Sequence, residues 1–316
     1  MAGDRRLVPG PEPVIRARLV IAAAVATMVG GAALAAADPG AGLAVPLWPQ
    51  GAPGSEGRRG EAEIVENSYI RNVHAPSLTV FRADPAHANG VGMIVIPGGG
   101  HRILVWVNEG VAPARMLNRL GITVFVLKYR LAREQGSTYT IEGDAAADAR
   151  RAVSWVRAHA ADYGVDPHRL GLMGFSAGGE LVSAVADNPP PAGVAPRDAI
   201  DRTSSRPDFQ VLVYPGPLGI PARAAAGAPP AFLAAGTLDA CCAAPTLTLY
   251  QQLRAVGVSA ELHLFADTDH GFNVAAHSER LSLQHWPDRL ADWLSDGGWL
   301  APGGGRRPTP SNWPAP

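Results

Sequence analysis

Short apolar segments rich in β-branched residues alternate with helical patterns through most of the chain. Neighbouring parallel strands need a long crossover connection, usually a helix, so this alternation predicts βαβ units. A mostly parallel sheet buries both of its faces, which places helices on either side. The pattern therefore predicts an α/β fold with a mostly parallel central sheet. Strands are expected at residues 77–83, 92–100, 122–130, 169–176, 208–216, 230–236 and 260–266, and helices at about 111–120, 144–164, 178–186, 244–256 and 280–295.

The N-terminal segment has the order of regions found in secretory signals. Arg16 and Arg18 precede an apolar stretch at 19–34, and small residues follow it. This order is typical of a signal peptide, here residues 1–37. The apolar stretch is short for a membrane span, which needs about 20 residues. We therefore expect an exported protein, periplasmic or extracellular, with no stable membrane span after processing; an uncleaved anchor is the alternative.

The rest of the chain divides by composition into three parts. Residues 38–59 are rich in Gly and Pro and are expected to be irregular. Residues 60–298 hold the alternating pattern and are expected to form one α/β domain, and the Pro- and Gly-rich residues 299–316 are expected to be a disordered tail. Within the domain, residues 188–207 are the longest segment without a periodic pattern. They are either a functional loop or a tolerated surface insertion.

Composition argues against several classes of protein. Apolar residues make up 47% of the chain, enough for a large core, and the net charge is −1 with no run of one sign. We therefore expect no nucleic-acid partner. The two cysteines, Cys241 and Cys242, are adjacent and cannot join distant segments, and no zinc-ligand spacing is present. We expect no metal and no organic cofactor.

The segment GLMGFSAGGEL places Ser176 between a predicted strand and a predicted helix, with Gly174 and Gly178 two residues away on either side. A sharp strand-to-helix turn exposes a serine hydroxyl, and glycines at these positions avoid collisions across the turn. The helix N-terminus adds amide groups and positive dipole near that hydroxyl. This context favours a nucleophile over the alternative, a glycine-bounded turn in the core.

A serine nucleophile needs a general base and a carboxylate that orients the base. His270 is the best placed of nine histidines, because it lies in a loop just after the last predicted strand. Asp239 follows the strand at 230–236 and is the preferred carboxylate, with Asp267 and Asp269 as alternatives. The order Ser, Asp, His along the chain is the order of α/β-hydrolase triads.

The oxyanion that forms during acyl transfer also needs N–H donors. One donor is expected at Ala177, directly after the candidate nucleophile. The others are expected in the loop formed by Gly98, Gly99 and Gly100, where backbone can approach a substrate without an intervening side chain. A plain glycine turn is the alternative.

Four motifs together resemble the secreted esterases of the α/β-hydrolase fold: VIPGGGHRILVWVNEG, LKYRLA, GLMGFSAGGEL and DHGF. The nearest group is that of acetylxylan esterases and other short-chain carboxylesterases, and the resemblance covers about residues 46–297. It implies an α/β-hydrolase fold, and the short connection between the strands at 208–216 and 230–236 leaves no room for a large cap domain. Carried over to this sequence, it implies a catalytic triad of Ser176, Asp239 and His270 and an oxyanion hole at Gly99, Gly100 and Ala177.

The sequence departs from this family at several positions. Pro97 stands where many relatives carry His, and His101 stands where an aromatic residue often follows the glycines, so substrate-side contacts are expected to differ. Cys241 and Cys242 lie in an unusual acid loop. They are interpreted as packing residues, with a vicinal disulfide or a redox-sensitive element as the alternative.

These observations predict an exported serine esterase that hydrolyses short-chain, acetyl-type esters on carbohydrate through an acyl-enzyme. The expected partner is a small-molecule or oligosaccharide ester, and the oligomeric state is left open. Trp106 and Tyr214 are candidates to stack on a sugar ring, with core packing as the alternative. The rival functions are a lipase or peptidase on the same fold, and a non-catalytic carbohydrate- or partner-binding protein.

Overall fold

The computed structural model describes residues 42, 44–188, 193 and 195–301. The chain divides into two units, Met1–Asp38 and Pro39–Pro316, and every described residue belongs to the second. The predicted signal peptide lies outside the described residues, and so does most of the predicted tail. Among the helices that are described, none combines the length and apolar character needed to cross a membrane.

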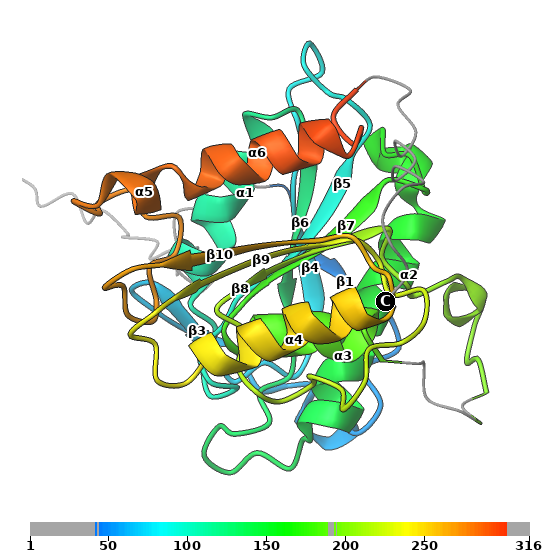
Figure 1. Ribbon diagram of the computed structural model, residues 1–316. Coiled ribbons are helices and arrows are strands. Elements are labelled where there is room, and N and C mark those ends of the chain that lie inside the picture. The colour runs from blue at the N-terminus through cyan, green and yellow to red at the C-terminus, as the bar shows by residue number, and fades with distance from the viewer. Residues whose placement is uncertain (1–41, 43, 189–192, 194, 302–316) are drawn as a thin grey trace, which may run out of the picture. The chain divides into compact units, whose positions relative to one another are not determined.

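An eight-stranded sheet runs through the centre of the second unit (Figure 1). The strands of the molecule are β1 (Ala44–Pro46), β2 (Ile64–Glu66), β3 (Tyr69–Arg71), β4 (Ser77–Phe81), β5 (Gly92–Ile96), β6 (Thr123–Lys128), β7 (Leu170–Phe175), β8 (Phe209–Val213), β9 (Ala231–Gly236) and β10 (Ala260–Phe265). The sheet order is β1-β4-β6-β5-β7-β8-β9-β10, and β2 and β3 form a separate antiparallel pair. In the large sheet, β4 is antiparallel to β1 and β6, and the remaining neighbours are parallel. The predicted mostly parallel sheet is confirmed.

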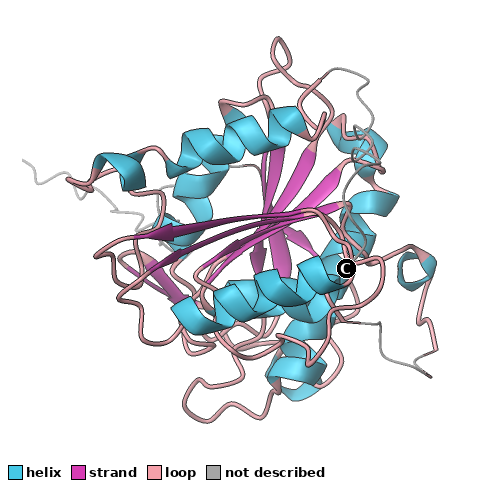
Figure 2. Cartoon of the chain, viewed as in Figure 1, coloured by secondary structure: helices cyan, strands magenta, loops and turns pink. Residues whose placement is uncertain are grey.

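Helices cover both faces of this sheet (Figure 2). They are α1 (Ala112–Asn118), α2 (Ala146–Ala158), α3 (Ala177–Ala186), α4 (Ala243–Ala255), α5 (Leu281–Gln284) and α6 (Trp286–Asp296). Figure 1 shows α1 and α6 on one face and α2, α3 and α4 on the other. The predicted placement of helices on both faces of the sheet is thereby confirmed.

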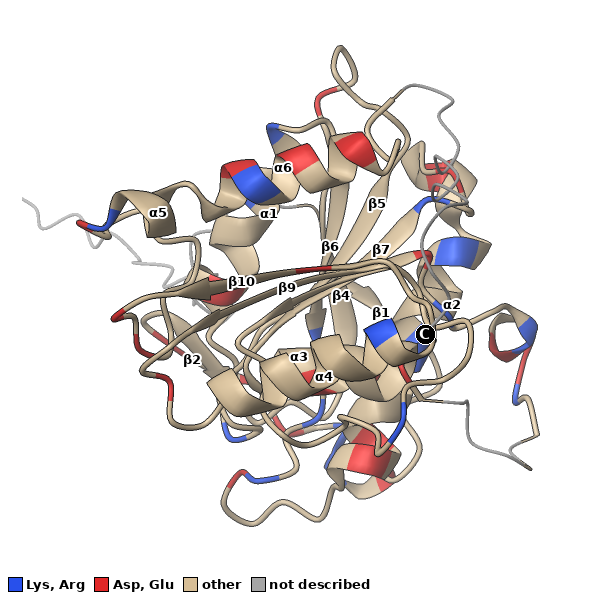
Figure 3. Cartoon of the chain, viewed as in Figure 1, with Lys and Arg blue, Asp and Glu red and all other residues tan. Residues whose placement is uncertain are grey.

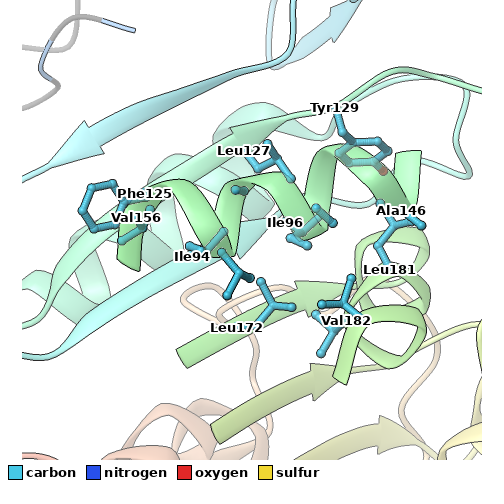
Figure 4. Packing of buried hydrophobic residues seen from close by; sticks show 14 of the residues in the cluster. Ile94, Ile96, Phe125, Leu127, Tyr129, Ala146, Val156, Leu172, Leu181 and Val182 are labelled. Atoms are coloured by element: carbon cyan, nitrogen blue, oxygen red, sulfur yellow. The ribbon is translucent and has the colours of Figure 1, made fainter. Parts of the chain in front are cut away.

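Each face of the sheet has its own hydrophobic core, because successive strand residues point to opposite sides. In β5, Ile94 and Ile96 pack with α2 and α3, whereas Met93 and Val95 pack with α1 and α6. Figure 4 shows Ile94 and Ile96 among side chains of α2 and α3 such as Leu181. Burial on both faces explains why these strands read as continuous apolar runs.

Charged residues lie mainly on helices and loops, and β7, β8 and β9 contain none (Figure 3). A buried ion pair joins the end of β6 to α2: the Nη2 atom of Arg130 lies 2.8 Å from Oδ1 of Asp148, and both side chains are almost completely buried. A charge removed from water needs a partner of this kind, since leaving either group alone would cost several kcal/mol. The pair therefore holds the first half of α2 against the sheet.

Two predicted boundaries differ from the structure. Residues 38–59 were expected to be irregular, yet β1 lies within them and pairs with β4, with Ala44 opposite Thr79. The tail was expected from residue 299, yet Trp299 is buried and its ring lies 4.6 Å from that of Phe209. A three-residue strand and a single buried aromatic residue are too short to produce a periodic signal, which explains both differences. The short pair β2 and β3 was not expected for the same reason.

The connection between β8 and β9, residues 214–230, is fully described and contains no helix or strand, as expected for a chain without a large cap there. The described part of the 188–207 segment lies along α2. Arg151 of α2 forms ion pairs of 2.6 Å with both Asp198 and Asp201, and the hydroxyl of Ser154 donates to the carbonyl of Thr203. This part of the segment is therefore attached to the helical layer.

Candidate active site

Five neighbouring parallel strands, β5, β7, β8, β9 and β10, end at the same edge of the sheet. The carboxyl ends of such strands are where α/β proteins place their functional groups. Ser176 directly follows β7, Asp239 lies three residues after β9, and His270 lies in the loop after β10. Three residues that are far apart in the sequence therefore meet at one edge.

Ser176 occupies a strained turn between β7 and α3. Its φ and ψ angles are 50° and −118°, a conformation that non-glycine residues rarely adopt. A Cβ atom at Gly174 would lie 2.3 Å from the carbonyl oxygen of Gly178, and one at Gly178 would lie 2.0 Å from that of Ile96. Both glycines are therefore required by the close approach of the turn to neighbouring backbone.

Ser176, His270 and Asp239 form a continuous series of hydrogen bonds. The Oγ atom of Ser176 lies 2.9 Å from Nε2 of His270, and Nδ1 of His270 lies 2.7 Å from Oδ2 of Asp239. When Nδ1–H donates to the carboxylate, Nε2 is free to accept the serine proton. The two alternative acids do not contact the ring: Asp269 accepts the main-chain N–H of His270, and Asp267 pairs with Arg280.

Asp239 is held by a two-cysteine loop. Its second oxygen, Oδ1, accepts hydrogen bonds from the main-chain N–H groups of Cys241, at 3.1 Å, and Cys242, at 3.0 Å. These two cysteines form a vicinal disulfide, which was the alternative to simple packing residues. Cys242 also packs in the core below α6. Disulfide sulfurs are not thiolates, so the group of Asp239 with the two cysteines does not fit a metal site.

The loop after β5 lies directly beside the serine turn. Gly99 and Gly100 have φ angles of 124° and 63°, and a Cβ atom at Gly98 would lie 2.9 Å from Cβ of Ser176. The N–H of Gly98 is already used, because it donates to Oε2 of Glu109 at 2.8 Å. Within the described part of the chain, the N–H groups of Gly99, Gly100 and Ala177 donate no hydrogen bond. They remain available to an oxyanion.

His101, which follows the three glycines, is completely buried rather than turned toward a substrate. Its Nε2 atom lies 2.8 Å from Oε2 of Glu180 in α3, and its ring meets that of Tyr129 edge-on at 6.0 Å. The hydroxyl of Tyr129 donates to the carbonyl of Pro97 at 3.0 Å. Pro97 and His101, the two residues that depart from the family pattern, thus hold this loop against Tyr129, which follows β6, and against α3.

Two further polar residues lie beneath the site. The carboxyl group of Glu109, on the helical turn Val107–Val111, contacts the hydroxyl of Tyr214 at 2.9 Å. Burial raises the pKa of Glu109, and burial together with Glu109 raises the pKa of Tyr214. Tyr214 is fully buried, so it does not stack on a sugar, and Trp106 packs against both cores. Glu109 was not predicted as a site residue. The sequence feature that could have indicated it is a charged residue within the apolar run after the three glycines.

Two adjoining grooves lie near the site, and His270 lines the larger of them. One has a volume of about 460 Å³ and the other about 370 Å³. They share Phe272 and Leu283. Most residues that line the larger groove are polar, whereas the smaller groove is lined mostly by apolar residues such as Val274 and Ala275. The candidate base therefore faces a groove with mostly polar residues, and a mostly apolar groove adjoins it.

Comparison with known proteins agrees with this architecture. Residues 98–224 match a family that is described by the α/β hydrolase fold. A crystal structure of an acetyl ester-xyloside bifunctional hydrolase from Caldicellulosiruptor lactoaceticus superimposes with a TM-score of 0.66 at 27% identity, covering 82% of this chain and 97% of that one.

Two characterised proteins are similar over part of the sequence. An acetylxylan esterase of Xylanibacter ruminicola is 32% identical over 131 residues, which is 42% of this chain and 24% of that protein. An ethyl acetate hydrolase of Pseudomonas putida is 28% identical over 164 residues, which is 50% of this chain and 47% of that protein. The chain thus spans less than half the length of either enzyme. The sheet, the strained serine turn and these similarities show that the chain has the α/β-hydrolase fold that its motifs predicted, and that the proteins it resembles are ester hydrolases.

Proposed function

We propose that this protein is a serine esterase that hydrolyses short-chain, acetyl-type esters, with a carbohydrate on the alcohol side. The observation that carries the proposal is the hydrogen-bonded series from Ser176 through His270 to Asp239 at the open edge of the sheet. This arrangement activates a hydroxyl that is a weak nucleophile by itself. The series argues against a purely binding function, since binding requires no such alignment.

In the proposed reaction, Oγ of Ser176 attacks the ester carbonyl carbon while Nε2 of His270 takes its proton. Asp239 keeps the Nδ1 proton in place and stabilises the imidazolium. The carbonyl oxygen becomes an oxyanion, which accepts hydrogen bonds from the free N–H groups of Gly99, Gly100 and Ala177. The imidazolium then protonates the departing alcohol, and a water molecule deprotonated by His270 releases the acid from the acyl-enzyme.

The proposed substrate follows from the grooves and from the relatives. A long acyl chain needs an apolar channel, because each buried CH₂ contributes about 0.8 kcal/mol. Most residues of the groove that His270 lines are polar, and the apolar groove beside it is not lined by His270. The similar proteins are an acetylxylan esterase, an acetyl ester-xyloside bifunctional hydrolase and an ethyl acetate hydrolase. Polar groups beside the base suit a sugar hydroxyl as the leaving group. Export through the N-terminal signal at 1–37 is part of this proposal.

The test is kcat/KM for p-nitrophenyl acetate, butyrate, octanoate and palmitate, alongside acetylated xylo-oligosaccharides, with Ser176→Ala as the control. We expect a maximum at acetate, turnover of the acetylated sugars, and loss of several orders of magnitude in the control. A maximum at octanoate or longer would refute the short-acyl preference. Turnover of p-nitrophenyl acetate but of no acetylated sugar would remove the carbohydrate assignment.

Intact mass of the exported protein tests cleavage near residue 37.

A further inference from the structure

Glu109 is a buried carboxyl group behind the candidate nucleophile that the proposed reaction does not use. It is 4% exposed and lies on the helical turn Val107–Val111, between the glycine loop and α1. Burying an ionisable group is costly unless it gains hydrogen bonds, so a position of this kind needs a structural or functional reason. The contacts of its two oxygens supply that reason.

One oxygen holds the loop that precedes the oxyanion donors. Oε2 of Glu109 accepts the N–H of Gly98 at 2.8 Å. A Cβ atom placed on Gly98 would lie 2.7 Å from this oxygen and 2.9 Å from Cβ of Ser176, so the carboxyl group lies immediately behind the serine turn. Because Gly98 directly precedes Gly99 and Gly100, holding its amide in place limits the directions that the next two N–H groups can take.

The other oxygen reaches the loop that carries the candidate base. Oε1 of Glu109 lies 2.9 Å from the hydroxyl of Tyr214, which directly follows β8. That hydroxyl lies 3.1 Å from Oδ1 of Asn273 and accepts the main-chain N–H of Asn273 at 3.1 Å. The Tyr214 ring lies 4.6 Å from the ring of His270. Glu109 thus connects the glycine loop with the loop of His270.

The count of protons determines which form of Glu109 completes this network. Tyr214 has one hydroxyl proton and two acceptors within reach, Glu109 and Asn273. A protonated Glu109 would donate to Tyr214, leaving the Tyr214 proton for Asn273, while its other oxygen still accepts from Gly98. Burial, which raises the pKa of Glu109, favours this neutral form. A glutamine side chain can make the same set of bonds.

We propose that Glu109 is a positioning residue for the esterase reaction, which holds the oxyanion loop at Gly98 and, through Tyr214, the loop of His270. The inference rests on the proposed function, because it assigns Glu109 a part in the same reaction. Its effect is exerted through the geometry of two loops and not through contact with the substrate. Its loss should therefore lower kcat while leaving substrate affinity nearly unchanged.

The experiment compares Glu109→Met, which keeps the length of the side chain without its hydrogen bonds, with Glu109→Gln, which keeps both. We expect Glu109→Met to lose about 100-fold in kcat, the size seen when one oxyanion donor is lost. KM should stay within about threefold of wild type, because Glu109 does not contact the substrate. Glu109→Gln should stay within about threefold of wild type, because it restores the bonds. The matched control is Asp187→Leu, which removes another buried carboxyl group with two hydrogen bonds, to Ser183 and Gln210.

The rate of labelling by a fluorophosphonate gives a second measurement that needs no ester substrate, because phosphonylation develops charge at the same oxyanion position. We expect the labelling rate to fall in Glu109→Met and to be restored in Glu109→Gln. Equal kcat in Glu109→Met and wild type would overturn the inference. The inference would also be overturned if Asp187→Leu lost as much kcat as Glu109→Met at the same drop in melting temperature. Glu109 would then contribute only to general stability.

If Glu109→Met does not fold, Tyr214→Phe tests the same network from its other end, because it removes the hydroxyl and keeps the ring against His270. We expect about a tenfold loss in kcat with KM unchanged, consistent with the loss of a hydrogen bond to a buried group. A wild-type kcat in Tyr214→Phe would refute the Tyr214 connection. If the wild-type protein is labelled but hydrolyses no ester, only the proposed function is refuted, because the labelling rates of the variants still test the role of Glu109. If the wild-type protein is not labelled, both proposals are refuted.

Discussion

The Nε2 atom of His270 lies 2.9 Å from the Oγ atom of Ser176, although 94 residues separate them in the sequence. Parallel strands bring them together, because β7 and β10 end at the same edge of one sheet. The bond also fixes which nitrogen of His270 faces the serine, since Nδ1 is occupied by Asp239. Asp239 therefore binds the ring nitrogen of His270 that faces away from the serine.

Asp239→Asn should lower kcat by about 10⁴-fold, because an amide cannot hold the imidazole in the required tautomer or stabilise its charged form. Asp267→Asn and Asp269→Asn are matched controls on the same edge, and neither carboxylate contacts the His270 ring. Both should stay within about threefold of wild type, because both side chains are exposed and the amide oxygen of an asparagine still accepts the N–H that Asp269 binds. Steady-state kinetics of the three variants decides the assignment. A near-normal Asp239→Asn beside a strongly impaired Asp267→Asn or Asp269→Asn would move the role.

Gly178→Ala should destabilise the fold by several kcal/mol, because the new Cβ atom would lie 2.0 Å from the carbonyl oxygen of Ile96. Backbone cannot move aside cheaply at that contact, so the serine turn would shift and activity would fall as well. Gly57→Ala is the control, since a Cβ atom there meets nothing within 4 Å. Urea unfolding measures both variants. Equal midpoints for the two would show that the turn tolerates a side chain.

The stability of the protein should depend on pH through Asp187, which is fully buried at the end of α3. Burial raises the pKa of its carboxyl group from 3.8 to about 6. The folded state then binds the proton more tightly than the unfolded state does. Protonation of Asp187 therefore stabilises the fold fully below the pKa of 3.8 in the unfolded chain, and this stabilisation is lost as pH rises through about 6. Two pKa units correspond to roughly 3 kcal/mol in the free energy of unfolding.

Asp187→Asn stays neutral at every pH and should remove this dependence. We expect the difference in free energy of unfolding between Asp187→Asn and wild type, variant minus wild type, to be larger at pH 7.5 than at pH 4.5. Urea titrations of both proteins at the two pH values provide the measurement. Parallel behaviour at the two pH values would mean that Asp187 does not retain its proton in the folded state.

The vicinal disulfide of Cys241 and Cys242 should affect activity through Asp239, because both of its main-chain N–H groups bind Oδ1 of that residue. Reduction by a dithiol opens the ring and frees the backbone of this loop. We expect kcat to fall by about tenfold or less, since one such hydrogen bond contributes about 1 kcal/mol. Alkylation before and after reduction counts the thiols. Thiols that react without reductant would show that the disulfide is absent.

The sequence by itself determined the features that arise between near neighbours. Apolar periodicity specified the order of strands and helices, because the repeat of a strand or helix is a local property. The residues Gly174 and Gly178 around Ser176 indicated a tight turn, because the crowding of Gly174 against Gly178 arises within a few positions, although the contact of Gly178 with Ile96 depends on the tertiary structure. Knowing that parallel strands end at one edge was then enough to place Ser176 and His270 in the same region.

Only the tertiary structure decided which distant groups touch. Asp239 contacts the His270 ring while Asp269, the immediate neighbour of His270, does not, because the direction of a side chain depends on the packing of its loop. Glu109 meets Tyr214 across 105 residues. Such contacts leave no periodic trace in the sequence, since each depends on how whole strands and loops are packed together and not on the residues beside it.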